Sequence, residues 1–438
     1  MTAPASASMP EDARTPAYSW VVLAMLCVIY TFNFLDRQLI SILTEPIRKE
    51  LGLSDLQMGL LGGIYFAAFY TIIGVIVGAL ADRTSRVRIL FIGSFLWSLF
   101  TIACGMAKTY PMLMAARMGV GVGEAAGAPP SYSIISDYFP ARRRGMALGL
   151  FSLGVPFGMA LGAGLGAKIA ELYGWRSAFI FIGAAGIVAS FFLLLIVREP
   201  RRGAQEPVSS EPPTSTVQPS FVSTVKMFFS RPTLLFTALA CGATAFVGYG
   251  VLNWTAPFLT RVKGINMGEI ALYYSLMLAI CMGAGTFLSG QLADWLSRRA
   301  KHWYALVPMI ALIAAVPFYI GFVWAPTWQI SMAFLAVPTL LNNAYLAPAL
   351  AVVQNSVRPE QRTTSGALLL MVLNLIGLGL GPTFVGGMST ALTPEHGEVI
   401  ALQLAMYALA PFYAVAIFFL ILEAGALRRE EKRALETA

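Results

Sequence analysis

Twelve long apolar segments constrain the fold of this chain more than any other feature of its sequence. A helix that crosses a bilayer needs about 20 consecutive apolar residues. Segments of this kind recur along all 438 residues and give a hydrophobic content of 57%. They lie at 18–43, 57–81, 87–107, 110–138, 145–170 and 176–197, and then at 233–259, 269–296, 304–323, 327–354, 365–392 and 398–422. The pattern predicts an all-α membrane protein with twelve transmembrane helices.

A polar segment divides these twelve segments into two sets of six. It begins with a run rich in proline, serine and charge, which is typical of a solvated linker. We therefore expect an N-terminal tail at 1–17, a six-helix bundle at 18–198, the linker at 199–231, a second six-helix bundle at 232–423 and a C-terminal tail at 424–438.

The 30 lysines and arginines are distributed unevenly between the loops on the two sides of the predicted bundles. Most of them lie on the side that also holds both termini and the linker. Short loops with an excess of basic residues stay on the cytoplasmic side. We therefore expect cytoplasmic termini in a multi-pass protein of the cell membrane, which in a bacterium is the inner membrane. The same distribution accounts for the net charge of +8 without a nucleic acid partner.

The sequence lacks the signatures of the common enzyme classes. Its four cysteines lie singly within apolar segments, so they indicate neither a disulfide framework nor a metal site. No serine has glycine two positions before and two positions after it, and no phosphate-binding glycine loop is present. We therefore expect a monomer that is not an enzyme and needs no metal or cofactor. Its energy source is then not ATP.

The two halves repeat a short motif in the loops that follow the second and eighth apolar segments. The first copy contains Gly78, Asp82, Arg83, Ser85 and Arg86, and the second contains Gly290, Asp294, Ser297 and Arg298 at an offset of 212 residues. Agreement at one spacing in equivalent loops indicates a duplication. Parallel repeats around a site at the midplane are an architecture of alternating-access transporters.

Both loops resemble the G-x-x-x-D-R/K-x-G-R-K/R motif of the major facilitator superfamily, with serine at the second glycine position. Three further segments resemble the spinster-type lipid transporters. These are Asn33-Phe-Leu-Asp36-Arg37, Arg117-Met-Gly-Val-Gly-Val-Gly123-Glu124-Ala125 and Gly174-Trp175-Arg176. The resemblance covers nearly the whole chain and implies the major facilitator fold, with two pseudo-symmetric bundles of six helices.

The resemblance also implies a gate. In the superfamily this motif latches the cytoplasmic ends of the two halves in the outward-open state. Its aspartate lies near a helix N-terminus and its arginine near an acidic residue at the end of the fourth span. The candidate gating residues are Gly78, Asp82, Arg83, Arg86, Asp137, Asp294 and Arg298. The alternative is that these loops only set the topology.

Four ionisable residues, Asp36, Arg37, Arg117 and Glu124, lie well inside predicted spans. Each costs about 2.5–3.5 kcal/mol at a helix centre unless it is paired or faces water. One interpretation is a fixed salt bridge that holds spans one and four together. The other is a proton-coupling cluster in which Asp36 and Glu124 take up and release protons. Arg117 and Glu124 lie seven residues apart, about 10 Å along one helix face, so Asp36 is a candidate third group.

Arg117 then supplies a fixed positive charge, and the resemblance implies that it also attracts an anionic head group. Asn33 shares a helix face with Asp36 and can join the same site. The predicted substrate-binding residues are Asn33, Arg37, Arg117, Glu124, Asn253, Trp254, Asn342, Asn343 and Tyr345. Charge in the first half and neutral polar or aromatic groups in the second suit an amphiphile. Each asparagine could instead join helices by hydrogen bonds.

These features predict a secondary active transporter, driven by the proton gradient, that moves a lysophospholipid or sphingoid-type lipid by alternating access. Its partners are then the amphiphilic substrate, protons and the membrane. An organic or aromatic carboxylate symporter of the same superfamily is the alternative. A membrane sensor without transport activity is a more distant one.

Overall fold

The computed structural model describes residues 16–81, 83–202, 221–297, 299–358 and 361–436, and in these ranges it contains helices and no strand. The first half comprises α1 (Ala17–Ile42), α2 (Thr44–Leu51), α3 (Asp55–Gly62), α4 (Ile64–Ala81), α5 (Arg86–Met106), α6 (Tyr110–Glu124), α7 (Ala128–Tyr138), α8 (Ala141–Ser152), α9 (Gly154–Tyr173) and α10 (Trp175–Ile196). This order confirms the all-α class.

The second half follows the same plan. It comprises α11 (Phe221–Ser230), α12 (Pro232–Arg261), α13 (Met267–Glu269), η1 (Ile270–Tyr274), α14 (Ser275–Met277), η2 (Leu278–Met282), α15 (Gly283–Ser297), α16 (Trp303–Trp324), α17 (Trp328–Leu341), α18 (Leu346–Ser356), α19 (Arg362–Val372), η4 (Leu373–Leu380), α20 (Gly381–Tyr407) and α21 (Ala410–Glu436). The segments labelled η are π-helical turns within longer helices.

Each of the twelve predicted spans coincides with one helix or with consecutive helices. Ten helical stretches in the described ranges are long and apolar enough to cross a membrane. One of them, Arg362–Arg433, contains 72 residues and turns back at Gly397, where φ is 74°, so it accounts for two passes. The fourth span is not among the ten, and it is divided into α6 and α7.

The break in the fourth span has a local cause. Pro129 and Pro130 occupy the first turn of α7, where proline is tolerated because its missing N–H needs no partner there. A proline inside a continuous helix has no N–H for the carbonyl four residues earlier and its ring clashes with that carbonyl, so α6 does not continue through Ala125 and Ala126 into α7. Glu124 is therefore the last residue of α6. The break places a carboxylate at a helix end inside the membrane.

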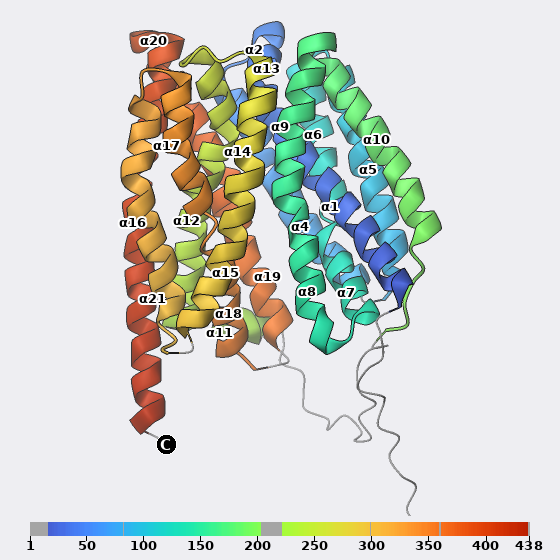
Figure 1. Cartoon of the computed structure of the whole chain (residues 1–438), viewed down its shortest axis with the longest axis vertical. Helices are drawn as coiled ribbons and strands as arrows, with labels where there is room; N and C mark the ends of the chain where they lie inside the picture. The colour runs from blue at the N-terminus through green and yellow to red at the C-terminus, as the bar shows by residue number, and fades with distance from the viewer. Residues whose placement is uncertain (1–15, 82, 203–220, 298, 359–360, 437–438) are drawn as a thin grey trace, which may run out of the picture.

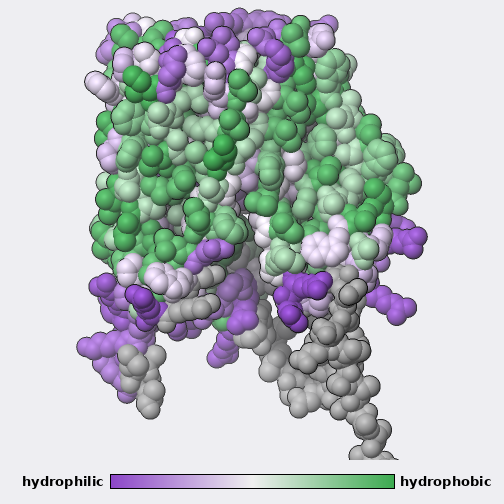
Figure 2. All heavy atoms as spheres, in the orientation of Figure 1, coloured by the Kyte–Doolittle hydropathy of each residue, from purple (hydrophilic) through white to green (hydrophobic). Residues whose placement is uncertain are grey.

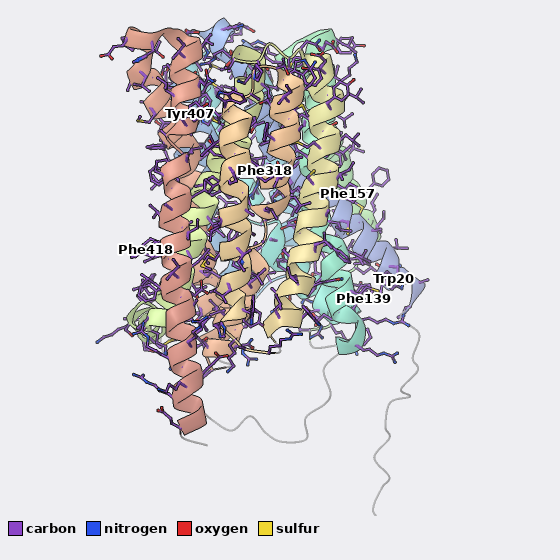
Figure 3. All side chains as sticks on the ribbon, turned by 60° about the vertical axis from the view of Figure 1, so that its left-hand side comes forward. Trp20, Phe139, Phe157, Phe318, Tyr407 and Phe418 are labelled. Carbon is purple, nitrogen blue, oxygen red and sulfur yellow. The ribbon has the colours of Figure 1, made fainter. Side chains whose placement is uncertain are left out.

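The surface supports insertion into a membrane. On the face that Figure 2 shows, a hydrophobic band lies between two hydrophilic ends. Large apolar side chains in this band point outward, among them Phe157, Phe318 and Phe418, which are 54%, 38% and 55% exposed (Figure 3). Such an exposed apolar surface suits lipid and not water.

The two halves stand side by side, with most of α1–α10 on the right and α12–α21 on the left in Figure 1, and α2 at the top between them. Helix α1 begins and α21 ends at the lower end, which we call the termini side. The halves meet at the opposite side, where Gly59 and Gly63 approach the backbone of Pro382 and Gly379. A Cβ built on Gly63 would lie 2.5 Å from the Gly379 carbonyl oxygen. On the termini side α8 of the first half and α19 of the second lie nearest the boundary between the halves (Figure 1).

Helices also occur outside the two predicted bundles. Within the predicted linker, residues 221–230 form α11, and its Phe228 is fully buried beside Leu234 and Val353 because it belongs to an apolar face. Within the predicted C-terminal tail, α21 continues to Glu436, since alanine, leucine, glutamate and arginine favour helix. Residues 1–15 and 203–220 lie outside the described ranges, so the rest of the predicted tail and linker stays a prediction.

Candidate functional site

The four ionisable residues of the predicted cluster come from α1 and α6, and two of them form an ion pair. Arg37 Nε lies 2.5 Å from Glu124 Oε2, and the two side chains are 9% and 0% exposed. The Arg37 guanidinium also lies 4.6–5.1 Å from the ring centres of Phe34, Phe66 and Tyr70. Aromatic faces attract a cation in a desolvated site. Spans one and four are thus joined through Arg37 and Glu124.

Asp36 points to a different neighbour, as expected for adjacent residues that diverge by about 100° on a helix. Its Oδ2 accepts a hydrogen bond from the Thr101 hydroxyl of α5. Its Oδ1 is buried and has no hydrogen-bond partner in the described structure. Only 2% of the residue is exposed. Asp36 therefore lies inside the first half, whereas Arg37 lies toward the interface with the second.

Arg117 is the second buried cation of the site. It is 1% exposed, its guanidinium lies 5.2 Å from the Phe66 ring centre, and its Nε and Nη1 have no acceptor among the described residues. Asn33 is also buried, and its Nδ2 likewise has no acceptor in the described part. Glu124 binds Arg37 instead of Arg117. The site thus holds several buried hydrogen-bond donors with spare capacity.

Arg37 and Arg117 border a small cavity at the interface of the halves. Its lining contains Arg37, Gln38, Gly62, Phe66, Arg117, Met159, Tyr249, Leu252, Asn253 and Leu378. Gln38 Nε2 adds another buried donor that lacks an acceptor in the ranges described. Guanidinium and amide donors suit carboxylate and phosphate oxygens. The cavity therefore has the chemistry to hold an anionic group.

A larger cavity of about 350 Å³ adjoins the small one. The two share Met159, Tyr249 and Leu252 in their linings, so they meet at these side chains. The larger cavity is lined by both halves and is mainly apolar, with Tyr30 and Tyr132 on the first half. Its volume lies in the range of pockets that bind small molecules. The arrangement is a charged end beside an apolar chamber.

Eight of the nine predicted substrate-binding residues fall into three groups in the structure. Asn342, Asn343 and Tyr345 line the larger cavity, and Arg37, Arg117 and Asn253 line the smaller one. Asn33 and Glu124 are buried beside the charged end.

Trp254 lies outside both linings. Its indole N–H donates to the Pro382 carbonyl at 2.9 Å, and the residue is 2% exposed. The side chain therefore packs α12 against α20. In the sequence, the amphipathic character of tryptophan does not show whether the side chain lines a cavity or packs two helices together.

Sequence reasoning missed several cavity residues because it followed charged and amide side chains. Tyr30, Phe34, Tyr132 and Tyr249 line the larger cavity, and their only sequence signal is an aromatic ring near the middle of a span. It also missed Glu423, which the predicted boundary left at a span end. Glu423 is 2% exposed and accepts a hydrogen bond of 2.7 Å from Thr237.

Those gating candidates that the structure describes lie on the termini side. Arg86 Nη1 lies 2.5 Å from Asp137 Oδ2, and Arg86 Nε lies 2.8 Å from Glu199 Oε1. Both partners belong to the first half, so these contacts do not bridge the halves. Gly78 lies in α4 and Arg83 in the exposed turn after it. Asp82, Arg298 and the side chain of Asp294 lie outside the described part, so their predicted roles stay predictions.

Hydrogen bonds around Glu199 keep it charged. Partial burial alone would raise its pKa, but hydrogen bonds from the Val87 backbone and from the Arg86 and Ser85 side chains hold the pKa of Glu199 below its usual value of 4.5. The carboxylate thereby binds the segment after α10 to the start of α5 and closes the termini end of the first half.

A second set of charges, which we call the interhalf ion cluster, joins the halves at the opposite side. It consists of Glu45, Arg48 and Asp55 of the first half with Arg261 and Glu398 of the second. Arg261 lies 2.5 Å from Glu45 and 2.6 Å from Asp55, and all three side chains are at most 7% exposed. Arg48 lies 2.6 Å from Glu398. Arg48 and Arg261 lie between the predicted spans, and the sequence analysis did not name them as site residues.

Known proteins resemble the chain over most of its length. A model of the Major Facilitator Superfamily matches residues 26–382. An "MFS-type efflux pump" of Mycolicibacterium smegmatis is 28% identical and covers 91% of each chain. "Protein spinster homolog 1" of Homo sapiens is 28% identical over 86% of this chain and 74% of its own.

This chain also resembles a solved structure with a TM-score of 0.85. That structure is of a bacterial homologue of the human lysosomal transporter spinster, in an inward-facing and unoccupied conformation. That protein is 31% identical, and the alignment covers 95% of this chain and 99% of the other. With 95% of this chain aligned, the similarity extends over both halves. The chain belongs to the Major Facilitator Superfamily and is a multi-pass membrane transporter of the spinster type.

Proposed function

We propose that this protein is a proton-coupled secondary transporter that moves a lysophospholipid or sphingoid-type lipid across the cell membrane by alternating access. The proton gradient supplies the energy, no cofactor or metal takes part, and a monomer with cytoplasmic termini performs the cycle. The observation that carries the proposal is the ion pair of Arg37 with Glu124 at the edge of a cavity lined by both halves. The printed names of the spinster relatives support the transporter class.

Proton coupling follows from the chemistry of the four buried charges. An arginine keeps its charge throughout the cycle, so a proton must be held by Asp36 or Glu124. Protonation of Glu124 removes the negative partner of Arg37. The guanidinium then stays buried and needs another acceptor, because an unpaired buried charge is costly. An anionic substrate group can supply that acceptor, so proton binding and substrate binding favour each other.

The cavity chemistry favours an amphiphile. Arg37, Arg117 and Gln38 supply donors at one end, and Leu252 and Met159 begin the apolar wall that continues into the larger cavity. The donors of the first region suit a head group with phosphate or carboxylate oxygens, and the apolar wall of the second suits an acyl or sphingoid chain. Burial of apolar surface stabilises the bound hydrocarbon chain of the lipid by about 25 cal/mol per Å².

A small organic or aromatic carboxylate is the second candidate substrate, since the same donors bind its carboxylate. The rings of Tyr30, Tyr132 and Tyr249 in the larger cavity favour an aromatic member of this class. A small carboxylate would leave much of the apolar wall without a partner. A panel of lysolipids and aromatic acids, compared by binding at two pH values, separates the two classes. Preference for a short carboxylate would contradict the lipid proposal.

Transport by the full chain in liposomes tests the coupling. We expect Asp36→Asn and Glu124→Gln each to lower the transport that a pH gradient drives by at least tenfold. Glu171→Gln is the matched control, because Glu171 is an exposed carboxylate paired with Lys168. Full gradient-driven transport by both cluster variants would refute the proposal.

A further inference from the structure

Thr101 has a hydroxyl group that faces two acceptors at once. Its Oγ1 lies within hydrogen-bond distance of Asp36 Oδ2 and 2.8 Å from the carbonyl oxygen of Trp97, one turn earlier in α5. A hydroxyl group has one hydrogen to donate. It therefore donates to only one of these oxygens at a time, and the charge on Asp36 determines which.

The two protonation states of Asp36 call for opposite arrangements of this hydrogen. A charged carboxylate only accepts hydrogen bonds, so the Thr101 hydroxyl must point toward it. A protonated carboxyl can itself donate to the Thr101 oxygen, and the hydroxyl is then available to the Trp97 carbonyl. Asp36 Oδ1 has no partner in the described structure, so Thr101 is the contact through which the charge is stabilised by a hydrogen bond.

We propose that Thr101 is a positioning residue whose hydroxyl hydrogen moves from Asp36 to the Trp97 carbonyl when Asp36 takes up a proton. No covalent bond other than the O–H bond of Asp36 is made or broken, and the hydroxyl only rotates. This inference rests on the proposed function, because it requires Asp36 to change its protonation state. It adds a residue of α5 to the site of α1 and α6.

The surroundings of Asp36 are compatible with this role. The charged groups that act on it are Arg117 of α6 and Arg37 of α1, together with Glu124. The Cys104 thiol of α5 is a further titratable neighbour. None of these supplies a hydrogen bond to Asp36 in the described structure, whereas Thr101 does. Substituting Thr101 therefore removes a hydrogen bond and leaves the neighbouring charges in place.

The position of the second acceptor connects the hydroxyl to α6. A Cβ built on Gly123 would lie 2.5 Å from the Trp97 nitrogen, so α5 and α6 touch at this point. Gly123 directly precedes Glu124. Threonine hydroxyls that bond to the carbonyl one turn earlier bend helices slightly. The rotating Thr101 hydroxyl, which we call the switch, thus links the surroundings of the two carboxylates of the proposed coupling site.

The test measures the protonation of Asp36 directly. The infrared C=O stretching band of a protonated carboxyl is followed against pH in the full-length protein in nanodiscs, and the part that Asp36→Asn removes belongs to Asp36. We expect Thr101→Val to move the midpoint of this band upward by about one pH unit, a tenfold gain in proton affinity, since the charged form loses its donor. Thr101→Ser keeps the hydroxyl and should keep the midpoint within a few tenths of a unit.

Thr237→Val is the matched control. The Thr237 hydroxyl also faces two acceptors, the Thr233 carbonyl at 2.8 Å and Glu423 at 2.7 Å, but it lies in the second half. An unchanged Asp36 midpoint in Thr101→Val, or an equal shift in Thr237→Val, would overturn the role of Thr101 and leave the proposed function intact. If Asp36→Asn removes no titrating band, both the proton coupling through Asp36 and the switch are wrong. Thr101→Ala provides the same measurement if the valine variant does not fold.

Discussion

Replacing Arg261 by glutamine should open the opposite side of the transporter. Arg261 approaches Glu45 and Asp55 to 2.5 and 2.6 Å, and the three side chains are 7%, 5% and 4% exposed. The substitution leaves two carboxylates of the first half buried against the second half without their main counter-charge. They regain water only if the halves separate there. The substitution therefore destabilises the conformation in which this side is closed.

The size of the shift follows from the contacts that remain. Removing one partner of a buried ion pair costs about 3–5 kcal/mol. Arg48 stays 3.8 Å from Asp55 and 3.9 Å from Glu45, so part of the positive charge is retained and the lower end applies. A shift of about 3 kcal/mol changes the ratio of the two conformations by roughly 100-fold. Such a shift is large enough to invert the populations of a carrier that favours the closed arrangement modestly.

Distances between paired spin labels measure the two sides separately. One pair is placed on Lys49 and Glu395 at the opposite side and another on Met146 and Thr363 at the termini side, all exposed positions. The half-buried Cys27 and Cys281 are replaced by alanine. In Arg261→Gln we expect longer distances for the first pair and shorter distances for the second.

Arg176→Gln is the control for this experiment. It removes an arginine from the same side, but Arg176 pairs with Glu50 of its own half at 2.9 Å. We expect it to leave both distance distributions as in the unsubstituted protein. Unchanged distributions in Arg261→Gln, or the same change in both variants, would refute the assignment of the interhalf ion cluster as a gate.

Two further predictions concern other contacts. The low pKa of Glu199 means that its bonds to Arg86 and Ser85 stabilise the fold above about pH 4.5 and are lost as the pH falls through its native pKa. Glu199→Gln should therefore lower Tm at pH 7 and reduce the loss of Tm on acidification, and identical Tm profiles would contradict this. Gly63→Ala should cost about 1–3 kcal/mol and lengthen the opposite-side label distance, because its methyl would lie 2.5 Å from the Gly379 oxygen. A Cβ built on Gly74 has no atom within 4 Å, so Gly74→Ala should neither destabilise the protein nor lengthen the label distance. An effect equal to that of Gly63→Ala would contradict the packing argument.

The helices and the family were predictable from the sequence because apolar length and the duplicated loop motif are local signals. The contacts between halves were not, because they join residues more than 200 positions apart, such as Glu45 and Arg261. The cluster residues could be named from their rarity within spans. Their pairing depends on the break after Glu124 and on the direction of Arg37, which adjacency to Asp36 constrains without choosing the partner. Thr101 gave no signal, since a single threonine in an apolar span is common.

The two charged sites act on different parts of the molecule, and this difference bears on how a cycle could be driven. Arg37 and Glu124 both belong to the first half, so their protonation alone makes or breaks no contact between the halves. The interhalf ion cluster joins both halves and favours the closed opposite side. A ligand shifts a conformational equilibrium only by its difference in affinity for the two states. In the proposed cycle, a substrate that binds Arg37 and also contacts Tyr249 and Leu252 of α12 reaches both halves and can offset the cluster. The proton then acts by making Arg37 available to that substrate.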